Sequence, residues 1–88
     1  MERVEAELFT DGGNDAVVRL PGRRFAGVLI QGDTLRILSA DVAELVELCA
    51  AGDVEEARRA ASLLHEEIGA KLQRYTEALD AHGEGRPF

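Results

Sequence analysis

The side chains that most often do chemistry are sparse in this sequence of 88 residues. There are two histidines, His65 and His82, and a single cysteine, Cys49. A metal site needs three or four ligands, and no second histidine follows His65 at the four-residue spacing of zinc proteases. The sequence also offers no serine, histidine and aspartate set and no carboxylate pair framed by a cleft. We therefore predict that the chain is not an enzyme and uses no metal or cofactor.

Two glycine-containing segments share features with loops that bind ions or phosphates. Residues 11–15, Asp-Gly-Gly-Asn-Asp, begin like a calcium loop, but Gly22 stands at the twelfth position, where an EF-hand needs glutamate. Neither this segment nor Gly32-Asp33 has the spacing of a P-loop or of the dinucleotide-binding glycine triplet. Both are therefore predicted to be tight turns. Cys49, with acids close by in the sequence, is predicted to be a small buried hydrophobe rather than a nucleophile.

The acidic residues concentrate in the second half of the chain. Overall there are 17 acids against 10 Lys and Arg, a net charge of −7. Residues 1–40 hold six acids and five arginines, whereas residues 41–88 hold eleven acids and five bases. This balance disfavours binding to phosphate backbones and favours a basic protein partner. The glutamates predicted to bind such a partner are Glu44, Glu47, Glu55, Glu56, Glu66 and Glu67.

Four of the five arginines in the first half lie close together in the sequence. They are Arg19, Arg23, Arg24 and Arg36. In one interpretation they pair across a sheet with Glu5, Glu7 and Asp15, as opposite charges on neighbouring strands commonly do. In the other, their planar guanidinium groups contact a phosphate or an acidic partner. The sequence leaves both interpretations open.

The first 38 residues have the pattern of short strands joined by turns. Residues 4–9 alternate apolar and acidic side chains, and residues 16–20 form the returning strand of a hairpin that Pro21 ends. Residues 25–30 are a third, mostly apolar run, and residues 34–38 alternate again after a turn at residues 31–33. Four short strands with tight turns predict an antiparallel β-meander.

From Asp41 onward the pattern becomes helical. Asp41 and Glu44 form a capping-box arrangement for a first helix, and Gly52 and Asp53 end it and begin a second. The second helix, from about residue 53 to 81, would be about 43 Å long, more than a small meander can cover. Its apolar seam is therefore predicted to bind the first helix, a second copy or a partner. The seam consists of Val54, Ala57, Ala61, Leu64, Ile68, Leu72, Tyr75 and Leu79.

Several short segments of the first half follow the pattern of a known group. They are Leu8-Phe9, Gly13 and Ala16-Val17-Val18-Arg19-Leu20-Pro21, and then Gly27-Val28 followed by Gly32-Asp33-Thr34-Leu35-Arg36-Ile37 as a closing strand. Residues 6–38 thereby resemble the AbrB/MazE/VapB group of antitoxins and transition-state regulators. The resemblance implies a homodimer with interleaved hairpins, DNA contacts from Arg19, Arg23 and Arg24, and a C-terminal segment that grips a toxin. The whole chain also resembles an uncharacterised family of small actinobacterial proteins.

The first turn departs from that group's pattern. It carries Asp11, Asn14 and Asp15 where those proteins often have basic or amide residues. Carboxylates repel phosphate, so the toxin-binding part of the resemblance fits this sequence better than the DNA-binding part.

Together these observations predict a single α+β domain with a short antiparallel β-meander at 1–38, a helical hairpin at 41–82 and a flexible tail at 83–88. We expect a non-enzymatic, protein-binding module of the antitoxin or immunity type, which neutralises a basic partner through its acidic helical half. The alternative is a dimeric, AbrB-like transcription regulator. A homodimer is expected because a chain this short buries a thin core. A lone cysteine and the absence of a signal peptide or a membrane-spanning stretch are typical of a cytoplasmic protein.

Overall fold

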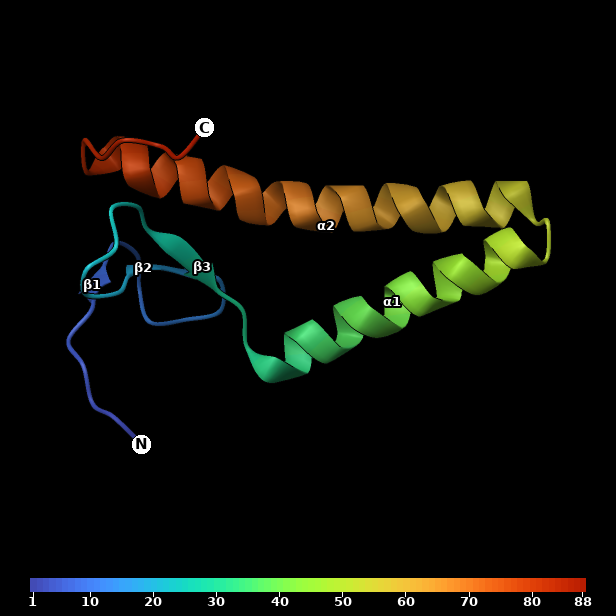
Figure 1. Cartoon of the computed structure of the whole chain (residues 1–88). Coiled ribbons are helices and arrows are strands. Elements are labelled where there is room, and N and C mark those ends of the chain that lie inside the picture. The colour runs from blue at the N-terminus through green and yellow to red at the C-terminus, as the bar shows by residue number, and fades with distance from the viewer. The chain divides into compact units, whose positions relative to one another are not determined.

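A computed structural model describes all residues of the chain, 1–88. They form two units, one made of residues 1–30 with 71–88 and the other of residues 31–70. The first holds a three-stranded sheet and the end of the second helix, and the second is a helical hairpin (Figure 1). The elements are β1 (Glu7–Leu8), β2 (Ala16–Arg19), β3 (Gly27–Leu29), α1 (Gly32–Ala50) and α2 (Val54–Ala81). The predicted α+β class, with strands followed by a helical hairpin, is confirmed.

The sheet is antiparallel in the order β1-β2-β3. Leu8 lies opposite Val18, and Val17 lies opposite Val28. The turn at residues 11–15 closes locally, because the Gly13 N–H donates to Asp11 Oδ1 at 3.3 Å and Asp15 adopts a φ of 60°. Asp tolerates this left-handed conformation better than most residues. The predicted hairpin is therefore present, although β1 covers only two residues of the predicted strand at 4–9.

The core of the sheet unit is small and centres on two fully buried side chains. Val17 of β2 is 0% exposed and Leu79 of α2 is 1% exposed, and Ala26, Tyr75 and Ala78 complete the cluster. The Tyr75 hydroxyl donates to the backbone carbonyl of Ala26 at 2.7 Å. Its ring thus fills the core while its polar end stays hydrogen-bonded, as a buried tyrosine requires.

The predicted fourth strand is wrong. Residues 34–38 belong to α1, which begins at Gly32 rather than at Asp41. The alternation of Leu35 and Ile37 is real, but Leu35 and Leu38 also start a three- and four-residue spacing that continues through the helix. No Gly or Pro interrupts residues 33–51, so the helix extends over the segment. The closing strand expected from the resemblance to antitoxins is consequently the start of a helix.

The hairpin turns at Gly52, whose φ is 75°. The Gly52 N–H donates to the carbonyl of Cys49 and the Asp53 N–H to that of Leu48, which satisfies the last carbonyls of α1 as glycine-ended helices do. Asp53 Oδ1 then accepts the N–H of Glu56 at 3.3 Å, so the predicted cap of the second helix is confirmed. Neither helix is sufficiently long and apolar to cross a membrane.

The segment 83–88, predicted to be a flexible tail, makes several contacts with the end of α2. Gly83 has a φ of 66°, and the next N–H, that of Glu84, returns to the carbonyl of Leu79 at 2.9 Å. Beyond the helix end, Arg86 donates to Asp80 at 2.6 Å. The end of the chain therefore folds back onto the last turns of α2.

Candidate protein-interaction site

An acidic groove runs between the two helices of the hairpin and has a volume of about 200 Å³. We use this name for the surface formed by Asp41, Glu44, Leu48, Glu56, Arg59, Ala60, Leu63, Leu64 and Glu67. The residues of each helix recur three or four positions apart, and that spacing places them along one side of an α-helix. The groove therefore follows from the sequence once both segments are helical.

The groove is strongly negative at its rim and apolar at its floor. Arg59 donates to Glu56 at 2.9 Å, whereas Asp41, Glu44 and Glu67 have no ion-pair partner in the structure. Between the acids lie leucines, of which Leu64 is 8% exposed and Leu63 is 62% exposed. Unpaired carboxylates around exposed apolar surface suit a basic surface that also has apolar side chains.

Three of the six glutamates predicted to bind a partner line this groove, namely Glu44, Glu56 and Glu67. The others, Glu47, Glu55 and Glu66, do not. Glu55 instead lies 3.5 Å from Arg58 on the exposed flank of α2. The groove adds Asp41, whose spacing from Glu44 predicts a helix cap and so gives no signal of a site residue. Its position three residues before Glu44 would have identified it if the helix had been extended to Gly32.

The predicted apolar seam of α2 divides into two sets. Ala57, Leu64, Tyr75 and Leu79 are buried, whereas Val54, Ala61, Ile68 and Leu72 are exposed. Tyr75 and Leu79 pack in the core of the sheet unit, so the expectation that they bind a partner is wrong. Within the hairpin unit, Val54 is 72% and Ile68 54% exposed. Within the sheet unit, Tyr75 and Leu79 are the members of the seam that pack in the core.

A second groove, here called the apolar groove, also lies within the hairpin and has a volume of about 530 Å³. It is lined by Leu45, Cys49, Gly52, Val54, Ala57, Arg58 and Ala61. The prediction that Cys49 is buried is wrong, because its side chain is exposed. Cys49 follows Leu48 of the acidic groove by one residue, about 100° around the helix. The two grooves therefore lie on either side of the line along which the helices meet.

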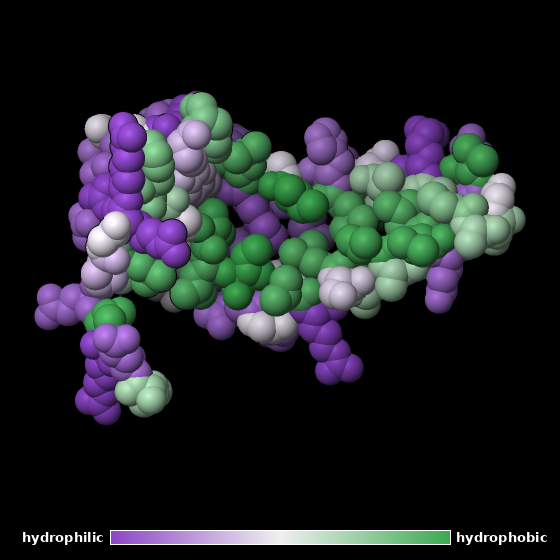
Figure 2. All heavy atoms as spheres, in the orientation of Figure 1, coloured by the Kyte–Doolittle hydropathy of each residue, from purple (hydrophilic) through white to green (hydrophobic).

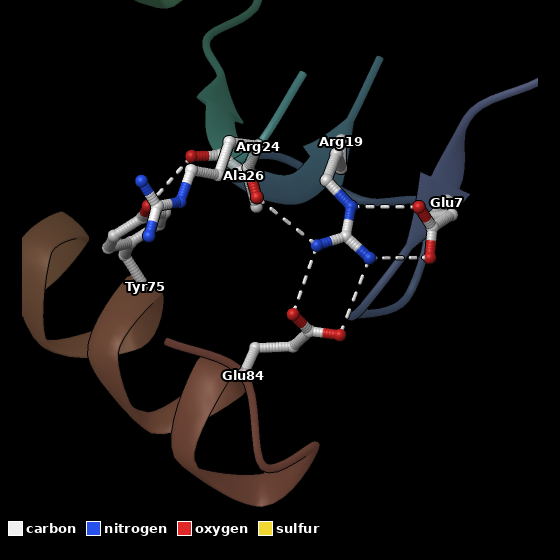
Figure 3. A network of polar contacts seen from close by, with 6 residues as sticks. All are labelled: Glu7, Arg19, Arg24, Ala26, Tyr75 and Glu84. Carbon is white, nitrogen blue, oxygen red and sulfur yellow. Dashed lines mark hydrogen bonds and ion pairs between the residues drawn. The ribbon is translucent and has the colours of Figure 1, made fainter. Parts of the chain in front are cut away.

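In the sheet unit, the most extensive polar contacts belong to Arg19 of β2 (Figure 3). Its Nε and one terminal nitrogen donate to the two carboxylate oxygens of Glu7, both at 2.8 Å. Its other terminal nitrogen donates to Glu84 at 3.0 Å and to the carbonyl of Arg24 at 3.4 Å. All five N–H donors of a guanidinium lie in one plane, and this arrangement uses two of its edges for carboxylates.

The Arg19 contacts decide between the two interpretations of that residue. Arg19 pairs with Glu7 across the sheet, as the first interpretation expected, and Asp15 pairs instead with Lys71. Arg23, Arg24 and Arg36 have no ion-pair partner, and the Arg24 guanidinium lies 5.1 Å from the centre of the Phe25 ring. Of the three residues that the antitoxin resemblance would place on DNA, Arg19 is therefore already occupied.

The contact with Arg19 makes the stability of the sheet unit depend on pH. The hydrogen bond from Arg19 lowers the pKa of Glu7 below its ordinary value of 4.5, and the carboxylates of Glu7 and Glu84 raise the pKa of Arg19. Because the pKa of Glu7 is lower in the folded state, its contribution is present above pH 4.5 and is lost as the pH falls through the folded value.

We expect Glu7→Gln to be less stable than the parent at neutral pH, and the difference to shrink below about pH 4.5. Denaturant melts at pH 7 and at pH 3 measure it, with Glu5→Gln as a control because Glu5 is exposed and unpaired. A constant difference between parent and Glu7→Gln across this range would contradict the prediction.

No group of three or more His, Cys, Asp or Glu side chains is placed to hold a metal ion. Among known proteins, the whole chain, residues 1–88, matches the model of a family of unknown function, DUF6959. No curated protein and no solved structure matches it. The geometry of the two grooves is therefore the basis for a functional assignment.

Proposed function

We propose that this chain, which belongs to the family DUF6959, is a non-enzymatic protein-binding module of the antitoxin or immunity type. Its acidic groove covers a basic surface on a partner protein and blocks that surface. The observation that carries the proposal is the gathering of Asp41, Glu44, Glu56 and Glu67 around exposed leucine surface in one groove. A basic surface that binds nucleic acid or another polyanion is the natural complement of this arrangement.

The charges and the apolar floor would have different roles in such a complex. Carboxylates that face a basic partner accelerate encounter and fix its orientation more than they increase affinity. Affinity would come from burying Leu63, which is 62% exposed, and the exposed part of Leu48 under the partner's apolar side chains. Arg59 stays paired with Glu56, so Asp41, Glu44 and Glu67 are the groups free to receive cations.

A capture experiment with matched charge variants tests the proposal. The chain is immobilised, and an extract of its native cells is passed over it at low and at moderate salt. The groove variant carries Asp41→Asn, Glu44→Gln and Glu67→Gln, the three acids of the groove that have no ion-pair partner. The control variant replaces Glu2, Glu5 and Glu77, which are exposed and outside the groove, so both lose the same net charge. We expect a basic protein on the parent and the control, and at least about a tenfold weaker affinity for the groove variant.

The captured protein is then purified and tested for an activity that harms cells. We expect the parent chain to suppress that activity and the groove variant to suppress it poorly, with association rates that fall as salt rises. Capture that is equal for the groove and control variants would show that net charge alone is responsible and would overturn the proposal. Absence of any basic protein under all salt conditions would overturn it as well.

A further inference from the structure

The helices of the hairpin each carry two apolar rows, of which only one is covered. In α1, Leu38 and Leu45 are partly buried, while Leu35 and Val42, three residues before each, are 57% and 47% exposed. Both rows repeat every seven residues, as the a and d positions of a helical bundle do. A bundle normally buries both rows. In α1 the hairpin covers the row of Leu38 and leaves the row of Leu35 open.

The same division occurs in α2. Ala57 and Leu64 are each 8% exposed, while Val54 and Ile68 are 72% and 54% exposed, with Ala61 between them also exposed. The open rows of the two helices lie on the same side of the hairpin, because Cys49, Val54 and Ala61 line the one apolar groove. We call this surface the apolar side, and it consists of Leu35, Val42, Val46 and Cys49 of α1 with Val54, Ala61 and Ile68 of α2. Figure 2 shows apolar residues gathered along both helices of the hairpin.

The distribution of charged residues on the hairpin indicates which partner can bind to the apolar side. Its acids are absent from the apolar groove, in which Arg58 is the one charged residue, and four of them line the acidic groove instead. For a chain with a net charge of −7, a second copy would be repelled over most of the hairpin surface. The apolar side is where two copies can meet without opposing carboxylates. A basic partner would instead be attracted to the acidic groove on the other side of the hairpin.

The size of the apolar side also suits a pair of hairpins. Two helices about 28 Å long and about 20 Å across together present on the order of 560 Å² per copy. Two copies would together bury on the order of 1,000 Å² of surface. This is about the smallest total area that specific protein–protein interfaces bury. A two-fold axis brings a surface of this kind onto itself, and two helical hairpins joined in this way make a four-helix bundle, in which all a and d rows are covered.

We infer that the apolar side of the hairpin binds a second copy of this chain to form a four-helix bundle. The inference concerns the opposite side of the hairpin from the acidic groove and does not depend on the proposed function. In the resulting dimer each copy keeps its acidic groove open to solvent.

The experiment compares two isoleucines that share exposure but not position. Ile68 lies on the apolar side and is 54% exposed, whereas Ile37 is 58% exposed and lies two residues, about 200° around α1, from Leu35. The molar mass of the full chain is measured by light scattering and sedimentation. We expect the parent and Ile37→Glu at twice the chain mass of 9.5 kDa. Ile68→Glu is expected to raise the dimer dissociation constant by about 100-fold or more, because each copy would bury a carboxylate.

Cys49 supplies a second readout that does not depend on mass. It is the one cysteine of the chain and lies on the apolar side, so its reaction with a thiol reagent should slow as protein concentration rises. In Ile68→Glu the rate should not depend on concentration. Circular dichroism checks that both variants keep their helices. A parent chain that stays at 9.5 kDa, or a dimer that survives Ile68→Glu unchanged, would overturn the inference.

Discussion

Replacing Leu79 with alanine is expected to lower the free energy of unfolding of the sheet unit by about 2–5 kcal/mol, the range found when a buried leucine leaves a cavity. Leu79 is 1% exposed and packs with Val17 and Tyr75 in a core with few other members. A core this small has little capacity to collapse around the missing methyl groups. The expected loss is therefore a large part of the stability available to a chain of this length.

Urea melts followed by tyrosine fluorescence measure this effect selectively, because Tyr75 is the one tyrosine and lies in the same core. The control is Leu63→Ala in the same helix, since Leu63 is 62% exposed. The two changes are alike in helix propensity, so the control should cost less than about 1 kcal/mol. Equal losses at Leu63 and Leu79 would mean that the sheet does not cover the end of α2.

The local features of the chain were predictable where one pattern had no competitor. The hairpin turn at residues 11–15 and the cap at Asp53 follow from residue types that favour those conformations, and both are present. The strand predicted at residues 34–38 was wrong because two patterns overlap there. Leu35 and Ile37 fit the two-residue period of a strand, while Leu35 and Leu38 fit the spacing of a helix. A segment this short cannot decide between them, and the helical continuation to Ala50 does.

The candidate site was predictable in kind and only partly in composition. That glutamates of the second half gather on helices follows from sequence alone, but which of them share a groove depends on where the two helices meet. Glu44 and Glu56 line the groove beside that contact, whereas Glu47 and Glu66 do not. The difference in burial between Tyr75 and Val54 is likewise a tertiary effect, because both follow the same spacing and differ only in what covers them.

The contacts that join α2 to the first turn could not be predicted from the sequence. Lys71 donates to both carboxylate oxygens of Asp15 at 2.9 Å, across 56 positions of the chain. The cross-strand interpretation had assigned Asp15 to an arginine of the sheet, since neighbouring strands were the partners that the sequence indicated. The actual partner comes from α2 and joins that helix to the first turn.

This pair is expected to have a coupling energy of about 1–2 kcal/mol, between the values typical of exposed and of buried ion pairs. The side chains of Lys71 and Asp15 are only 14% and 21% exposed, so water screens their attraction less than at an open surface. A double-mutant cycle with Asp15→Asn and Lys71→Met measures the coupling in urea melts. Asparagine tolerates the φ of 60° at this position, and methionine keeps most of the lysine stem, so neither change adds strain.

The matched control is the pair of Glu55 and Arg58, whose side chains are 77% and 73% exposed and whose charged atoms are 3.5 Å apart. Its cycle, with Glu55→Gln and Arg58→Met, should give about 0–0.5 kcal/mol, since solvent and side-chain entropy offset nearly all of an exposed attraction. Each cycle measures a pair of one acid and one base, so the two pairs have the same charges and differ in burial. A difference between the two coupling energies therefore reports the effect of burial. If the Asp15–Lys71 coupling were as small as the control, the turn at residues 11–15 would be held by its own hydrogen bonds and by Arg74 of α2, which donates to the carbonyl of Asp15 and to Asp11, and not by Lys71.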